Sequence, residues 1–184
     1  PKAVYEIESK ERGRSMSEMT KENLKAAFAG ESQAHIKYLA FSVKAEKDGK
    51  PHIARLFRAI SHAERVHAIN HLKELAGVGD TVANLEEAIA GETFEVEEMY
   101  SAYLAVADEQ GEKGAKRSMT YAKEAEKIHA DMFGEAKNAA EVGEDWNIDT
   151  VYVCPVCGFT HIGEPPERCP VCNVKSERFK AFTA

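Results

Sequence analysis

Two short stretches decide the expected fold: Ala63-Glu64-Arg65-Val66-His67-Ala68 and Glu124-Ala125-Glu126-Lys127-Ile128-His129-Ala130. Each carries a glutamate and a histidine three residues apart. On an α-helix this spacing turns the side chains by only about 60°, so both point to one face. Apolar spacing and stop signals predict four long helices, at about residues 20–48, 52–76, 83–109 and 115–142. The sequence therefore predicts a four-helix bundle with acidic and imidazole groups inside it.

Further glutamates lie at mirror-image distances from the expected helix turns. Glu31 and His67 are centred on residue 49, and Glu95 and His129 are centred on residue 112. Glu98 and Glu126 share the second centre. Glycines stand at or beside both centres, as is usual just past a helix end. Folding the chain there brings the carboxylates and imidazoles of each helical hairpin to one level.

The expected site holds two metal ions. Hard carboxylates with imidazoles suit iron or manganese, and bridging glutamates can hold two cations close together. A single Glu-x-x-His is usually a solvated pair, but here the pattern occurs in both hairpins. The bundle template asks for four glutamates and two histidines. This chain offers seven candidate ligands: Glu31, Glu64, His67, Glu95, Glu98, Glu126 and His129. Glu92, one turn before Glu95, is expected at the surface or as support for the ligands.

All four cysteines lie near the end of the chain. Cys154-Pro-Val-Cys157 and Cys169-Pro-Val-Cys172 are two Cys-x-x-Cys hooks, which bring four thiolates into tetrahedral reach. Such a set favours zinc or a single iron over a disulfide framework. Iron would make the site a one-electron carrier, whereas zinc would make it structural.

Composition limits the classes of function. The 184 residues carry a net charge of −7, which argues against binding the phosphate backbone of nucleic acids. No run is apolar enough to span a membrane, and the charged start lacks the apolar core of a secretory signal. We expect a cytoplasmic protein with a tail over residues 1–19, a helical domain over 20–143 and a small metal domain over 149–184.

The linker between the second and third helices is short. A helix of this length spans roughly 37 Å, whereas the residues from Gly77 to Ala83 reach at most about 25 Å. A bundle of the ferritin type needs a crossover along its whole length at this point. The chain therefore folds up-down-up-down, or each bundle combines the first two helices of one subunit with the last two of another. We favour the swapped homodimer.

These motifs resemble the rubrerythrin family. Beside the two Glu-x-x-His stretches, the resemblance rests on Ala29-Gly30-Glu31-Ser32 and Gly91-Glu92-Thr93-Phe94-Glu95-Val96-Glu97-Glu98-Met99-Tyr100. The four-cysteine segment looks like the family's rubredoxin-like domain. The resemblance starts near residue 20 and covers nearly all that follows. It implies a mainly α ferritin-like four-helix bundle with a small rubredoxin-like knuckle domain.

The resemblance also implies a function. It is that of a non-haem di-iron peroxidase, which reduces hydrogen peroxide to water and protects against oxidative stress. Electrons would come from an NAD(P)H-dependent rubredoxin reductase or a similar donor, through iron at the four cysteines. Glu64 and Glu126 would bridge the irons, and His67 would replace Glu98 on one iron when the site is reduced. Tyr38 and Tyr103 match tyrosines that hydrogen-bond the glutamates.

Two other functions stay open from the sequence. One is a ferritin-like iron-handling protein or ferroxidase with a structural zinc ribbon. The other is a di-iron oxidase or oxygenase that acts on an organic substrate. Both keep the metal ligands and differ in what the reduced site reacts with.

Overall fold

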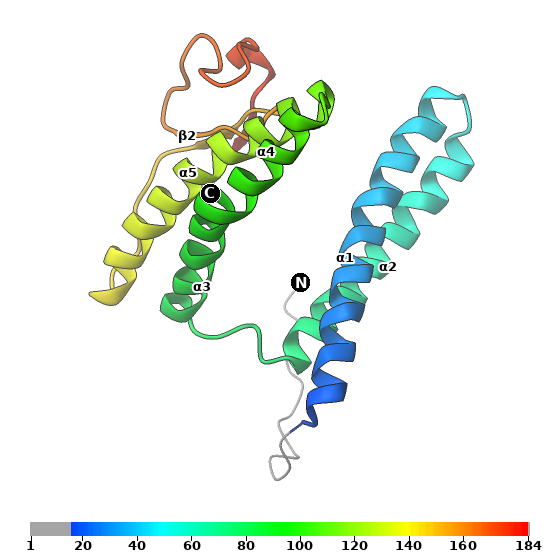
Figure 1. Cartoon of the computed structure of the whole chain (residues 1–184), viewed down its shortest axis with the longest axis horizontal. Helices are drawn as coiled ribbons and strands as arrows, with labels where there is room; N and C mark the ends of the chain where they lie inside the picture. Colours follow the sequence, from blue (N-terminus) through cyan, green and yellow to red (C-terminus); the bar gives the residue numbers. More distant parts are fainter. Residues whose placement is uncertain (1–15, 184) are drawn as a thin grey trace. The chain divides into compact units, whose positions relative to one another are not determined.

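The computed structural model describes residues 16–183, so the expected tail lies mostly outside the described part. The chain divides into two compact units, one ending at Val78 and one beginning at Gly79. Figure 1 traces both units along the chain. Each unit is described by itself below.

The first unit is a helical hairpin of α1 (Glu18–Lys47) and α2 (Pro51–Glu74). Ser17 caps α1, because its hydroxyl oxygen accepts a hydrogen bond from the Thr20 amide. The hairpin turns at Gly49, whose φ of +69° is one that side chains disfavour. Proline then begins α2, where its missing N–H is not needed.

The buried part of the contact between α1 and α2 consists of small side chains. The buried residues of the two helices are Ser42, Ala45, Ala54, Ser61 and Ala68. Several large apolar side chains remain open, including Ile36 at 61% and Leu56 at 60% exposure. The hairpin therefore leaves apolar surface uncovered within the single chain, as half of a bundle would.

The second unit contains the other hairpin. One nearly continuous helical rod runs through α3 (Thr81–Phe94), the π-helical turn η1 (Glu95–Met99) and α4 (Tyr100–Glu109). Asp80 caps its start by accepting from the Ala83 amide at 2.9 Å. After the turn the chain returns as α5 (Lys113–Glu141). The long third helix expected from the sequence is present, but its π-helical turn was not predicted.

A small three-stranded antiparallel sheet completes this unit. Its order is β2-β1-β3, with β1 (Val151–Val153) between β2 (Thr160–Ile162) and β3 (Lys180–Phe182). Val151 pairs with Ile162 on one side and with Phe182 on the other. A 3₁₀ turn, η2 (Ser176–Arg178), precedes β3.

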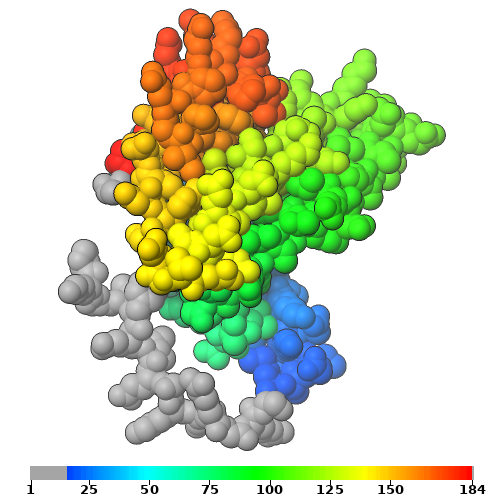
Figure 2. All heavy atoms as spheres, turned by 90° about the vertical axis from the view of Figure 1, so that its left-hand side faces the viewer, coloured from blue at the N-terminus to red at the C-terminus, as the bar shows by residue number. Residues whose placement is uncertain are grey.

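The knuckle module packs on α5. Its buried core consists of Cys154, Cys157, Phe159 and Cys169, and Tyr121 and Ile128 of α5 pack against it. Figure 2 shows the orange knuckle residues resting on the yellow-green helix. This contact lies inside one compact unit, so it places the cysteine site beside α5 of the same chain.

The predicted fold class is confirmed: long helices dominate and a small sheet with cysteine knuckles follows them. Each predicted hairpin forms as expected. The joining of hairpins into one bundle and the helix swap stay predictions. Within residues 16–183, no helix combines the length and the apolar character needed to cross a membrane.

Candidate metal centres

The first hairpin brings Glu31, Glu64 and His67 together, and we call them the first acidic cluster. One potential ligand atom from each lies within 4.8 Å of the others. His67 Nδ1 is 3.0 Å from Glu64 Oε2 and 3.9 Å from Glu31 Oε1. All three were predicted from the sequence, because the i, i+3 pair lies on one helix face and the fold-back at Gly49 supplies Glu31.

A reciprocal link joins α1 and α2 beside this cluster. His35 Nδ1 lies 2.9 Å from the carbonyl oxygen of Ser61, and the Ser61 hydroxyl donates to the His35 carbonyl at 2.9 Å. Ser61 is fully buried. It lies three residues before Glu64, and His35 lies four after Glu31. The link therefore fixes the two helices next to the cluster.

The second hairpin brings Glu92, Glu126 and His129 together, and we call them the second acidic cluster. Their potential ligand atoms also lie within 4.8 Å of one another. His129 Nδ1 is 2.5 Å from Glu126 Oε2 and 4.0 Å from Glu92 Oε1. Glu126 and His129 were predicted here, but Glu92 was not expected among the ligands. Its three-residue spacing to Glu95 was the signal that could have identified it.

Carboxylates crowd the second cluster. Burial, and then repulsion from Glu126 and hydrogen bonding with it, raise the pKa of Glu92 to about 7. Burial and the charge of Glu126 also raise the pKa of Glu95. Without a cation such groups share protons, because like charges this close cannot all ionise cheaply. A bound cation would relieve the repulsion, so the arrangement fits a metal site.

A π-helical turn follows Glu92 on this rod and carries further carboxylates, among them Glu95 and Glu98. Glu95 begins the turn, and the Tyr100 amide donates to its carbonyl. The Ser101 hydroxyl supports the turn by donating to the Val96 carbonyl at 3.1 Å. Glu95 is half-buried and Glu98 is exposed, and both lie outside the two acidic clusters. Turns of this kind are common at functional sites.

The tyrosine beside the carboxylates is Tyr100. Its burial, and then Glu95, Glu126 and Glu92, raise the pKa of its phenol. Tyr38 instead packs against aromatic rings, with centroid distances of 6.1 Å to Phe41 and 6.2 Å to Phe57. The phenol on which the carboxylates of the second cluster act therefore comes from a position that the sequence analysis did not select.

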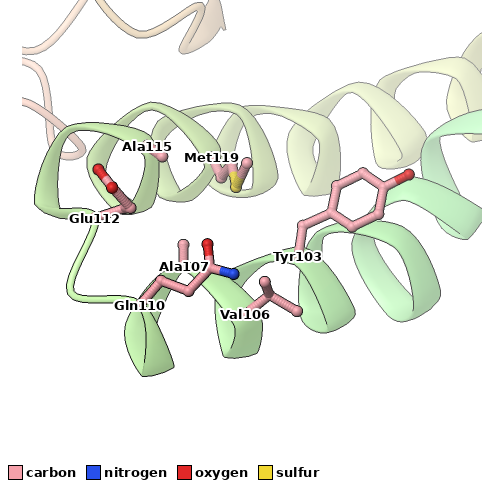
Figure 3. Close-up of a pocket in the computed structure, with 7 residues that line it drawn as sticks. All are labelled: Tyr103, Val106, Ala107, Gln110, Glu112, Ala115 and Met119. Carbon is pink, nitrogen blue, oxygen red and sulfur yellow. The ribbon is translucent and has the colours of Figure 1, made fainter.

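The other expected tyrosine, Tyr103, is half exposed and lies farther along α4. It borders a mainly apolar hollow of about 250 Å³ (Figure 3). The remaining lining residues are Val106, Ala107, Gln110, Glu112, Ala115 and Met119. The hollow carries no cluster of ligand atoms among the described residues, so it offers no metal chemistry.

The four cysteines converge as predicted. Cys154 Sγ lies 3.5 Å from Cys172 Sγ, and Cys157 Sγ lies 3.4 Å from Cys169 Sγ. Tetrahedral coordination at about 2.3 Å separates sulfurs by roughly 3.8 Å. The structure places these four as free thiols without a disulfide. The geometry therefore fits one tetrahedral ion.

The two hooks have the same local backbone. The Gly158 amide donates to the Cys154 carbonyl at 3.0 Å, and the Asn173 amide donates to the Cys169 carbonyl at 2.9 Å. Gly158 and Asn173 take φ values of +82° and +63°. Such turns aim successive amides at the sulfurs, and thiolates are stabilised by these donors.

The protonation of the thiols agrees with a metal site. Burial raises the pKa of Cys157, and its neighbouring thiols add to the rise. Burial also acts on Cys169, but the backbone amides of Cys172 and Val171 outweigh it and lower the pKa of that thiol. A metal ion would hold all four as thiolates.

The fold and the sites together define a class of protein: a helical carboxylate–histidine metalloprotein with an attached four-cysteine site. Comparison with known families agrees. The family model described as Rubrerythrin matches residues 22–137, and the one described as Rubrerythrin, rubredoxin-like domain matches residues 152–180. The chain belongs to the rubrerythrin family.

Known relatives span most of the chain. It is 45% identical over 178 residues to Rubrerythrin-2 of Clostridium acetobutylicum, covering 89% of this chain and 97% of that protein. It is 38% identical over 177 residues to nigerythrin of Nitratidesulfovibrio vulgaris, covering 89% and 86%. A solved structure of fully reduced, all-ferrous nigerythrin matches with a TM-score of 0.53 at 34% identity, covering 95% of this chain and 91% of that one.

Family and geometry together identify the cofactors. The acidic clusters are candidate ligands of a di-iron site, and the four cysteines form a rubredoxin-like site for one iron. A rubredoxin-like domain implies electron transfer with a redox partner. These features fit an iron-binding oxidoreductase.

Proposed function

We propose that this chain reduces hydrogen peroxide to water at an iron pair held jointly by the first and second acidic clusters. One observation carries the proposal. The two clusters together contain four glutamates and two histidines, each cluster with its own Glu-x-x-His. That is the ligand set of di-iron carboxylate bundles.

The rod formed by α3, η1 and α4 contributes Glu92 and, in addition to the six residues of the two clusters, Glu95 in this proposal. Glu92 lies against Glu126 and His129, and the charge of Glu126 acts on Glu95. Glu98 was predicted as a ligand and stays an untested prediction, but its exposure favours Glu92 in its place. If His67 exchanges with a carboxylate on reduction, burial favours Glu95 over Glu98 as that carboxylate, because Glu95 is half-buried and Glu98 is exposed.

Bound as a ferrous pair, iron would supply the two electrons and the Lewis acidity that cleavage of the O–O bond requires. The chain's own groups do the rest. Glu64 and Glu126 would hold the iron pair, and their charge would balance the cations. The raised pKa of Glu92 means that a proton leaves this carboxyl when a cation binds. The charges of Glu95, Glu126 and Glu92 act on the phenol of Tyr100, and we propose that this phenol hydrogen-bonds one of them when the cations are bound.

The iron held by the four cysteines would reduce the iron pair again after each turnover. Their module packs on α5, which carries two residues of the second cluster. The outer donor is proposed to be an NAD(P)H-dependent rubredoxin reductase or a similar protein. We place the protein in the cytoplasm, because thiols in such a site persist best under reducing conditions.

The two clusters are proposed to meet across a helix-swapped homodimer. The connection between α2 and α3 is six residues, Leu75–Asp80, and reaches at most about 20 Å. Helix α2, with 24 residues, spans roughly 36 Å. A crossover within one chain is therefore too short for ferritin-type packing, and the open apolar surface of the first hairpin supports a second copy as its cover.

Stopped-flow mixing tests the proposal. Fully reduced, iron-loaded protein is mixed anaerobically with peroxide, and separately with O₂, while iron oxidation is followed by absorbance. Peroxide is expected to react much faster. Faster oxidation by O₂ would instead support a ferroxidase or an oxygenase. Metal analysis with a visible spectrum checks the cysteine site, since iron there is coloured when ferric and zinc is colourless.

A further inference from the structure

Thr160, the first residue of β2, touches the second acidic cluster from the knuckle module. Its Oγ1 lies 2.8 Å from His129 Nε2 and 3.0 Å from the Gly158 carbonyl oxygen. The residue is buried, at 9% exposure. It is far from His129 in sequence and had no place in the predicted site.

Proton counting fixes the direction of these hydrogen bonds. A carbonyl can only accept, so the single hydroxyl proton of Thr160 goes to Gly158. The threonine oxygen must then accept from His129, which puts a proton on Nε2. The ring nitrogen left for a cation is Nδ1, which contacts Glu126 Oε2 at 2.5 Å and lies 4.0 Å from Glu92 Oε1. A metal-binding imidazole needs this arrangement, in which the outer nitrogen carries a proton and the other nitrogen faces the cation.

The packing of the knuckle on α5 holds Thr160 in place. Gly158 has a φ of +82°, and a side chain there would come within 3.6 Å of Ala125. Phe159 is buried in the cysteine core, which Tyr121 and Ile128 of α5 cover. The start of β2 is therefore held against α5, next to the His129 ring.

The other histidine, His67, has no residue that plays the part of Thr160. His67 is 53% exposed, and its Nδ1 contacts Glu64 and Glu31. Among residues 16–183 its Nε2 has no hydrogen-bond partner, and it lies outside the knuckle contact. The two Glu-x-x-His pairs are alike in sequence but differ in this second contact.

We propose that Thr160 is a positioning residue that orients the His129 ring with Nε2–H held and Nδ1 turned to the metal. His129 is thereby the fixed imidazole, while His67 keeps the freedom to move. The inference rests on the proposed function only in requiring a metal ion at the second acidic cluster.

The test uses the whole protein loaded with zinc, a diamagnetic probe, and ¹⁵N-labelled at histidine. Three variants are compared with wild type: Thr160→Val, Thr160→Ser and the control Thr120→Val. Thr120 lies on α5, and its hydroxyl donates to the Lys116 carbonyl of the same helix. The readouts are zinc affinity at the second cluster, by chelator competition, and solvent exchange of the His129 Nε2 proton.

Thr160→Val is expected to lose affinity by about 10-fold or more, as is usual when a ligand's hydrogen-bond partner is removed. Its Nε2 proton should exchange rapidly. Thr160→Ser and Thr120→Val should retain the affinity and slow exchange of wild type. Unchanged affinity and protection in Thr160→Val would overturn the inference, as would failure of Thr160→Ser to rescue.

Two further results distinguish failure of the Thr160 inference from damage to the cysteine site and from failure of the proposed metal site. If Thr160→Val loses the cysteine site, the wild-type protein decides, because rapid exchange of its Nε2 proton contradicts the inference by itself. If wild-type His129 does not respond to zinc at all, the proposed metal site fails instead of the role of Thr160.

Discussion

Replacing Glu92 by glutamine should stabilise the metal-free protein and weaken its metal binding. The pKa of Glu92 rises from 4.5 to about 7, which corresponds to roughly 3 kcal/mol of preference for the neutral carboxyl. The side chain is 22% exposed, so solvent screening reduces its expected effect on the free energy of unfolding to about 1–2 kcal/mol. Glutamine keeps the shape and removes the charge, so most of this penalty should vanish at pH 8.

The dependence on pH has a definite sign. The folded-state pKa lies above the unfolded value, so the stabilisation by protonated Glu92 is complete below pH 4.5 and is lost as the pH rises through about 7. Metal-free wild type should therefore be less stable at pH 8 than at pH 5. Glu92→Gln should flatten this part of the profile.

Urea unfolding in the presence of a chelator, at pH values from 5 to 8, measures both effects. Glu98→Gln is the matched control, because Glu98 is exposed and outside both clusters. In ferrous titrations Glu92→Gln should lose affinity by about 10-fold or more, whereas Glu98→Gln should not. Equal effects of the two variants on stability or on affinity would refute the assignment.

Three further predictions concern the assembled site. Mixing unfolded Glu64→Gln and Glu126→Gln chains and refolding them together should restore activity if helices are swapped, because one bundle then carries both intact clusters; an inactive mixture contradicts the swap. His67→Ala should still bind ferric iron but turn over peroxide more slowly after reduction; unchanged coordination of the reduced site, by Mössbauer spectroscopy, would remove His67 from the mechanism. Cys157→Ser should lose the colour of the cysteine site yet keep iron at the clusters, which metal analysis checks.

Local patterns predicted most of the structure. The first acidic cluster follows from the i, i+3 pair in α2 and from a helix turn marked by Gly49. The four-cysteine site likewise follows from two short hooks, whose backbone turns act over a few residues. Contacts set by one helix face or one turn can be read from spacing alone.

The second cluster was predicted only in part, because it depends on the register between two helices. Mirror pairing about residue 112 selected Glu98, but α4 ends at Glu109 and the fold-back places Glu92 beside Glu126. The π-helical turn at Glu95–Met99 also changes the faces that follow it. A sequence reading that assumes 3.6 residues per turn throughout cannot predict this shift of the helix faces.

The contact between Thr160 and His129 left no signal in the sequence. It joins residues 31 positions apart and forms only because the knuckle packs on α5. Tyr100 illustrates the same limit, since the carboxylates that act on its phenol come from separate elements: Glu92 from α3, Glu95 from η1 and Glu126 from α5. Such contacts need the tertiary structure.

The most direct measurement is a single turnover of the fully reduced, iron-loaded protein with peroxide, followed at the visible absorption of the ferric cysteine site. The account predicts that the iron pair is oxidised first and that the visible band grows afterwards, as the cysteine iron passes its electron on. Glu126→Gln, which damages the second cluster, should delay this band strongly. A band that appears equally fast in that variant would mean that peroxide oxidises the cysteine site directly, and would contradict the account.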